Sequence, residues 1–169
     1  MKASAIPGDS ATASVLVKVP RPMAFKVFTE EIDLWWRRGP RFRASGKHAG
    51  IIHLEPRVGG RVFESFDTQS GPKVLETGRI TVWEPPARFV LDWRAANFKP
   101  DERTQVEVLF AESASGTQVT VIHTGFASLR KDHPVRHGQE DAAFVAGIGM
   151  FWGALLTSLR VRAEENQIG

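Results

Sequence analysis

The stretch that decides the fold is Val74-Leu-Glu-Thr-Gly-Arg-Ile-Thr-Val-Trp-Glu-Pro-Pro-Ala-Arg-Phe-Val-Leu-Asp-Trp93, in which two apolar runs flank the turn Glu84–Ala87. Runs rich in β-branched and aromatic residues that meet at a proline-containing turn are typical of an antiparallel hairpin. Counting outward from the turn predicts the pairs Val82–Phe89, Ile80–Leu91, Gly78–Trp93 and Arg79–Asp92. Apolar partners then share one face of the hairpin and opposite charges share the other, so only one face suits a core.

Short strands and turns continue on both sides of this hairpin. The apolar and turn residues predict strands at 51–55, 61–67, 74–83, 88–95, 104–111 and 117–124. A separate first strand is predicted at Ser14–Val19, where valines alternate with other residues. Two short helices are expected between Pro20 and Trp36, because apolar residues there recur at helical spacing. Turns at such regular intervals indicate consecutive antiparallel hairpins.

A long helix is predicted at the end of the chain, from Gln139 to Glu165. Its apolar stripe contains Phe144, Ile148, Phe151, Leu155 and Leu159, widened by Trp152 and Leu156. Gly149 and Gly153 weaken a helix interior, so we expect them to permit close approach to the sheet or to border an empty space. The sheet and the helix each have one apolar face, and burying one against the other predicts an α+β fold.

Composition limits the classes of function. A chain of 169 residues is expected to form one domain, here 14–166, after a flexible tail at 1–13. The absence of cysteine excludes disulfides, thiolate metal sites and a cysteine nucleophile, and makes a reducing cytoplasm the simplest location. A net charge of +3 is too small for a nucleic-acid footprint, and no apolar run is long enough for a membrane span.

Several motifs resemble one known family. They are Phe28-Thr-Glu-Glu-Ile-Asp-Leu-Trp-Trp36, Glu55-Pro-Arg-Val-Gly-Gly-Arg-Val-Phe-Glu64, Trp83-Glu-Pro-Pro-Ala-Arg88, Leu91-Asp-Trp93, Thr104-Gln-Val-Glu-Val-Leu-Phe110 and Gly116-Thr-Gln-Val-Thr-Val-Ile-His123. Together they are similar to the bacterial single-domain branch of the activator of heat-shock protein 90 ATPase family, within the START-like (SRPBCC) superfamily. The resemblance implies a helix-grip fold, in which a curved seven-stranded antiparallel sheet wraps round the last helix and leaves an elongated cavity. It implies no single activity.

The inward face of the predicted sheet supplies the candidate site. Extending the pairing places Trp93 opposite Val106, Leu91 opposite Val108 and Phe89 opposite Phe110, and then Val106 opposite His123. The turn at Asp67–Pro72 places Glu64 opposite Glu76. The candidate ligand-binding residues are Glu64, Glu76, Trp93, Val106, Val108, Phe110, His123, Phe151 and Trp152.

The polar candidates have two interpretations each. Facing carboxylates in a low dielectric raise the pKa of one of them, so Glu64 and Glu76 are either an acid–base pair or two hydrated groups at an open end. His123 is either a structural histidine or a hydrogen-bonding group for a ligand. His133 and His137 are separated by a proline and lack a third ligand, so no metal site is predicted, and no cofactor is expected.

Three functions therefore stay open. The first is binding of a small apolar molecule in the cavity. The second is a cyclase- or hydrolase-like enzyme that uses the cavity carboxylates or the histidine for proton transfer. The third is a module that binds a chaperone through an exposed patch. The sequence is compatible with a monomer or a homodimer.

Overall fold

The computed structural model describes residues 10–45, 48–94, 103–126 and 141–165, except for the side chains of residues 141–144. Its elements are β1 (Ser10–Val17), α1 (Arg21–Glu30), α2 (Ile32–Trp35), β2 (Gly50–Leu54), β3 (Arg61–Thr68), β4 (Gly71–Glu84), β5 (Arg88–Trp93), β6 (Thr104–Ser113), β7 (Gly116–Thr124) and α3 (Asp141–Glu165). The predicted order of elements and the α+β class are confirmed. The first strand begins earlier than predicted, so residues 10–13 belong to β1 instead of the tail.

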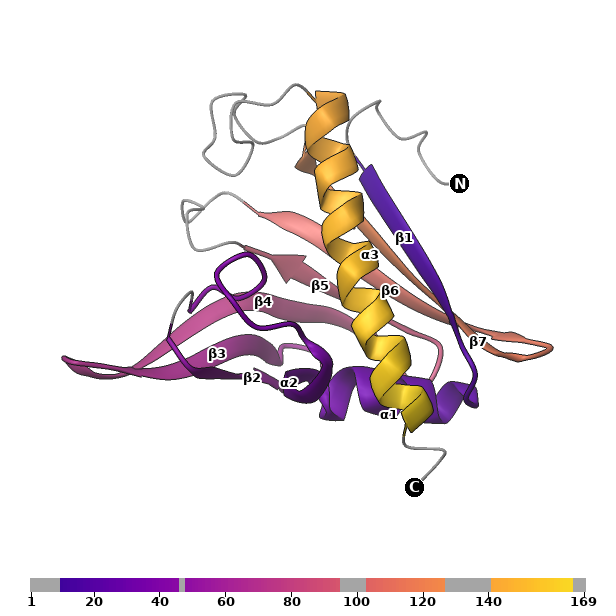
Figure 1. Ribbon diagram of the computed structural model, residues 1–169, viewed down its shortest axis with the longest axis horizontal. Coiled ribbons are helices and arrows are strands. Elements are labelled where there is room, and N and C mark those ends of the chain that lie inside the picture. Colours follow the sequence, from indigo (N-terminus) through magenta and orange to yellow (C-terminus); the bar gives the residue numbers. More distant parts are fainter. Residues whose placement is uncertain (1–9, 46–47, 95–102, 127–140, 166–169) are drawn as a thin grey trace.

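The seven strands form one antiparallel sheet in the order β1-β7-β6-β5-β4-β3-β2. The first strand therefore pairs with the last one, and β1 and β2 are the two edges of the sheet. Figure 1 shows α3 lying across one face of the sheet beside β1, with α1 and α2 at one end. This is the arrangement expected of a helix-grip fold.

The hairpin that decided the fold has its predicted register over half of its length. Gly78 lies opposite Trp93 and Ile80 opposite Leu91, as predicted. Beyond Ile80 a bulge adds one residue to β4, so that Val82 faces Val90, and the predicted Val82–Phe89 pair is wrong. A bulge leaves two residues of one strand opposite one residue of its partner, which bends the strand.

The pairing of β5 with β6 is shifted by two residues from the prediction. Leu91 faces Val106, and Trp93 faces Thr104 instead of Val106. Because side chains alternate with a period of two, this shift keeps every residue on its predicted face. The predicted pairing of Val106 with His123, between β6 and β7, is confirmed.

Aromatic side chains of α1 pack against aromatic side chains of the sheet, beneath one half of α3. The ring of Phe25 lies 5.0 Å from that of Phe110, and the ring of Phe28 lies 5.4 Å from that of Phe89. Buried aromatic side chains of this size contribute about 1.5–3 kcal/mol each to stability. Leu155, like Leu159 one helical turn later, is fully buried on the sheet side of α3, as its apolar stripe predicted. The side chain of Phe144 lies outside the described residues.

The free edge of β2 is closed by side chains from the preceding segment. Asp33 Oδ1 accepts the Ile52 N–H at 2.9 Å and an Arg43 N–H at 2.7 Å. The Arg43 side chain is 2% exposed and also donates to the carbonyls of Trp36 and Gly50. Burial alone raises the pKa of Asp33, but these hydrogen bonds and the charge of Arg43 lower it overall. Backbone groups at the outer side of the edge strand β2 are thus hydrogen-bonded by the ion pair of the buried Arg43 and the partly buried Asp33.

Candidate functional site

Four aromatic side chains on the α3 side of the sheet form what we call the aromatic rim: Trp36, Phe42, Trp93 and Phe151. Trp36 stacks on Trp93 with ring centroids 6.0 Å apart, and Phe42 stacks on Phe151 at 5.5 Å. The Trp36 indole N–H donates to the Phe42 carbonyl at 2.9 Å, which fixes the two rings relative to each other. Trp36 is buried, whereas the other three rings are only partly buried. The rim thus joins a loop, β5 and α3 and leaves apolar surface accessible.

A directional chain of hydrogen bonds lies behind the rim. An indole nitrogen only donates, so the 3.1 Å bond from Trp152 Nε1 makes His123 Nδ1 an acceptor. The proton of a neutral His123 is then on Nε2, which donates to Thr104 Oγ1 at 2.6 Å. The Thr104 hydroxyl donates in turn to the Trp93 carbonyl at 3.4 Å. The chain ties α3 to β5, β6 and β7 and uses both nitrogens of His123.

Burial decides the charge of His123. The side chain is 4% exposed, and no carboxylate accompanies it in the hydrogen-bond chain. Removal from water lowers the pKa of His123 to about 3, so the imidazole is neutral at physiological pH. This agrees with the donor and acceptor roles given by Trp152 and Thr104. The geometry is that of a satisfied structural histidine.

Glu64 is buried on the predicted inward face, but its partners were not predicted. Its two carboxylate oxygens accept the backbone N–H groups of Ala44 at 2.7 Å and Ser45 at 3.0 Å. Glu64 therefore holds the segment that carries Phe42 against β3. The sequence contains no local signal for this contact, because the two segments are distant along the chain.

The predicted facing of Glu64 and Glu76 is wrong. A register shift between Val62 and Phe63 places Phe63 opposite Glu76, and Leu75 opposite Glu64. Glu76 therefore lies on the other face of the sheet, where it forms an ion pair with Arg79 at 2.6 Å. The two carboxylates cannot share a proton in this arrangement.

The remaining predicted residues divide into two groups. Val106, Val108 and Phe110 are 1–2% exposed and belong to the hydrophobic core. Trp93 and Phe151 are in the rim, with the buried Trp152 behind them. The prediction missed Phe42, and missed Thr104 as the partner of His123. Thr104 had a usable signal, since it shares the inward parity of Val106.

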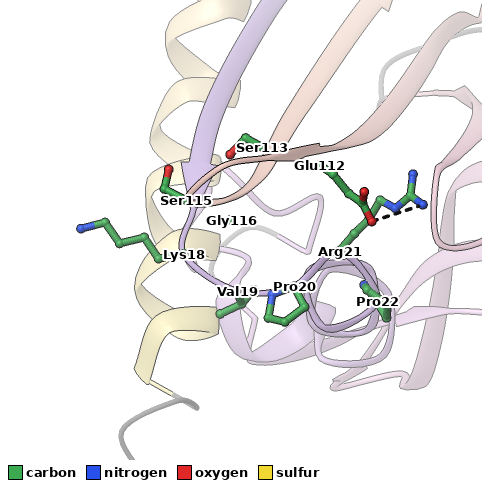
Figure 2. A pocket seen from close by; sticks show the side chains of 9 residues that line it. All are labelled: Lys18, Val19, Pro20, Arg21, Pro22, Glu112, Ser113, Ser115 and Gly116. Carbon is green, nitrogen blue, oxygen red and sulfur yellow. Dashed lines mark ion pairs between the residues drawn. The ribbon is translucent and has the colours of Figure 1, made fainter.

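A separate surface groove of about 400 Å³ lies at the turn between β6 and β7, where β1 leads into α1 (Figure 2). Arg21 and Glu112 face each other across it at 3.7 Å, and the Glu112 side chain is 74% exposed. Its lining residues are Lys18, Val19, Pro20, Arg21, Pro22, Glu112, Ser113, Ser115 and Gly116. None of the predicted site residues lines this groove.

The part of the chain that the structure describes contains neither a cluster of metal-ligating side chains nor a membrane-spanning helix. No three metal-ligating side chains gather among these residues, and His133 and His137 lie outside them. Among the same residues, no helix has the length and apolar character needed to cross a bilayer.

A curved antiparallel sheet gripping a C-terminal helix, with an aromatic rim between them, defines a helix-grip protein. The chain belongs to the family described as activator of Hsp90 ATPase homolog 1-like proteins, whose model matches residues 18–145. The resemblance found in the sequence motifs is thereby confirmed. No curated protein matches this sequence.

Solved bacterial structures share the fold at low sequence identity. A Staphylococcus aureus protein of unknown function has a TM-score of 0.67 at 13% identity, covering 95% of this chain and 96% of that one. A Nitrosomonas europaea protein has a TM-score of 0.65 at 16% identity, covering 97% and 99%. A Mesorhizobium loti protein has a TM-score of 0.61 at 18% identity, covering 93% and 97%. At these identities the likeness concerns the fold alone.

Proposed function

We propose that this protein binds a small, largely apolar molecule in the cytoplasm, at the aromatic rim between the sheet and α3. The observation that carries the proposal is the partial exposure of Phe42, Trp93 and Phe151 in an otherwise closed aromatic core. Apolar sites with a few polar groups are typical of small-molecule binding. Flat stacked rings favour a ligand with a planar or aromatic portion.

The fixed geometry of the rim supports this proposal. Glu64 anchors the Ala44–Ser45 backbone, and the Trp36 indole anchors the Phe42 carbonyl, so the loop side is held in place. On the helix side, Trp152 is held by His123. A site whose walls are already ordered loses little conformational entropy when a ligand binds. In this interpretation Glu64 and His123 position the walls, and the rings contact the ligand.

The test uses the dye 8-anilinonaphthalene-1-sulfonate as an apolar aromatic probe. The expected result is saturable dye fluorescence that falls several-fold in Phe151→Ala and Trp93→Ala. Val74→Ser is the matched control, because Val74 is an exposed apolar residue that belongs to a different surface. Equal dye binding by the rim variants and the control would reject the proposal. Native mass spectrometry of protein purified from its own host then identifies any molecule that remains bound.

A chaperone-binding role is the second candidate, and a different surface favours it. Ile51 and Val74 are 52% and 59% exposed, and both pair with Ser65 on the outer face of the sheet. Beside them His53 stacks on Phe63 at 4.7 Å, and the Arg61 guanidinium lies 4.4 Å from the centre of the same ring. Clustered exposed apolar groups with adjacent charge suit a protein partner.

ATPase measurements with the cognate Hsp90-type chaperone test this second role. The expected result is stimulation that Val74→Asp, or Ile51→Asp, reduces at least fivefold, while Phe151→Ala leaves it unchanged. No stimulation at high protein concentration would eliminate the role. The enzyme alternative has less support, because Glu76 lies on the face of the sheet opposite to Glu64 and both nitrogens of His123 are engaged in hydrogen bonds.

A further inference from the structure

The segment that brings Phe42 to the aromatic rim is rich in arginine. Its sequence is Arg37-Arg-Gly-Pro-Arg-Phe-Arg43, in which four of the seven residues are arginine. Two of these arginines form ion pairs with the same carboxylate, since Asp33 lies 3.3 Å from Arg38 and 2.7 Å from Arg43. The single negative charge of Asp33 is therefore shared by two positive charges.

The other two arginines, Arg37 and Arg41, are exposed. Among the residues that the structure describes, no carboxylate lies within ion-pair distance of either guanidinium group. Glu64 also contacts this part of the chain, but it is buried and accepts the backbone N–H groups of Ala44 and Ser45 instead. The charges of Arg37 and Arg41 are thus available to a bound anion.

Both of these guanidinium groups lie over a ring of the aromatic rim. The guanidinium carbon of Arg37 is 5.0 Å from the centre of the Phe42 ring, and that of Arg41 is 5.4 Å from it. Phe42 in turn stacks on Phe151. The ring attracts a guanidinium group electrostatically and holds it nearby, while the N–H groups can still donate to an anion. Two positive charges therefore border the partly exposed apolar surface of the rim.

We propose that the molecule bound at the aromatic rim is an organic anion, with a planar apolar portion on the rings and its negative group at Arg37 and Arg41. This inference rests on the proposed binding function and adds the charge of the ligand. Guanidinium groups bind planar anionic groups through paired hydrogen bonds. Because both guanidinium groups lie within 5.4 Å of the Phe42 ring centre, the negative group is attached to the planar portion directly or through a short linker.

Isothermal titration calorimetry with two probes of equal shape tests the inference. 2-Naphthoate carries a carboxylate, whereas 2-naphthamide has the same rings and a neutral amide. We expect 2-naphthoate to bind more tightly by about fivefold or more, as an exposed charge pair allows. The double variant Arg37→Gln and Arg41→Gln should remove this preference by weakening the binding of 2-naphthoate alone. Both residues are exposed, so the variant should fold like the wild type.

Arg160→Gln is the matched control for the loss of positive charge. Arg160 is also exposed, but it lies about 13 Å farther along the axis of α3 than Phe151. This variant should keep the preference for 2-naphthoate. Its loss in Arg160→Gln to the same extent as in the double variant would show a nonspecific effect of net charge and would overturn the inference.

The remaining outcomes separate this inference from the proposed function. Equal affinity for the two probes, or a preference that persists in the double variant, would overturn the inference and leave the proposed function intact. If neither probe binds, or if Phe151→Ala leaves the affinity for 2-naphthamide unchanged, the proposed function fails and the inference fails with it.

Discussion

The pH dependence of stability should report directly on His123. The ordinary pKa of this imidazole is 6.5, and burial lowers it to about 3 in the folded protein. Between these values the unfolded chain binds a proton that the folded protein does not. Stability is therefore complete above pH 6.5 and falls as the pH decreases toward the folded pKa. From pH 7 to pH 5 the loss is about 2 kcal/mol, and a folded pKa of 4 gives nearly the same value.

The measurement is urea-induced unfolding at pH 7, 6 and 5 for the wild type and His123→Gln. Glutamine has the same donor and acceptor types without titrating, so the loss attributed to His123 should disappear. Hydrogen bonds from Arg61 lower the pKa of Glu55 to about 2, and that of Asp33 is also lowered, so the folded protein keeps both carboxylates ionised in this range. In the unfolded chain, with ordinary pKa values of 4.5 and 3.8, they begin to bind protons only near pH 5 and contribute little. His53→Gln, on the outer face, is the control and should retain the wild-type slope. An identical slope in wild type and His123→Gln would refute the reasoning.

Three further predictions concern particular contacts. Gly149→Ala should raise the free energy of unfolding by about 1 kcal/mol, because a Cβ there meets nothing and alanine favours helix; thermal unfolding checks this. Gly78→Ala should lower the free energy of unfolding, since its Cβ would lie 2.7 Å from Leu91 Cδ1 and 2.9 Å from the Asp92 carbonyl. Equal stability of the two variants would contradict both expectations. Glu64→Ala should cost about 2–3 kcal/mol by leaving one buried and one partly buried N–H group unpaired, with exchange of the Ala44 and Ser45 amides, followed by NMR, as the readout.

The sequence was sufficient to predict the fold because its main determinants are local. The turn at Glu84–Ala87 predicted which two strands pair and the pairs from Ile80 onward, although the bulge makes the pairs next to the turn differ by one residue. Period-two alternation gave the inward parity of His123 and Glu64. The parity survived the two-residue shift between β5 and β6, since an even shift does not exchange the faces. The predicted pairing of β5 with β6 was displaced because the sequence between them gives no tight-turn signal from which to count.

The bulge in β4 opposite Val62 and Phe63 explains the largest error in the site. A sequence does not indicate where one extra residue will be accommodated, and each bulge reverses the parity of the residues beyond it. The register without a bulge would have buried Glu76 against Glu64, and the observed one pairs Glu76 with Arg79 instead. The role of Glu64 as acceptor for Ala44 and Ser45 was also inaccessible, because it depends on how a distant loop lies on β3.

The ion pair of Asp33 and Arg43 has a consequence for the addition of further strands to the sheet. A sheet with two free edge strands can pair with further molecules at both edges without limit. A sheet with one free edge strand can pair with only one further molecule. Because this pair occupies the Ile52 N–H and the Gly50 carbonyl, these backbone groups of β2 cannot pair with a strand of another molecule. Two side chains beside the rim thus also protect the β2 edge from strand addition by another molecule.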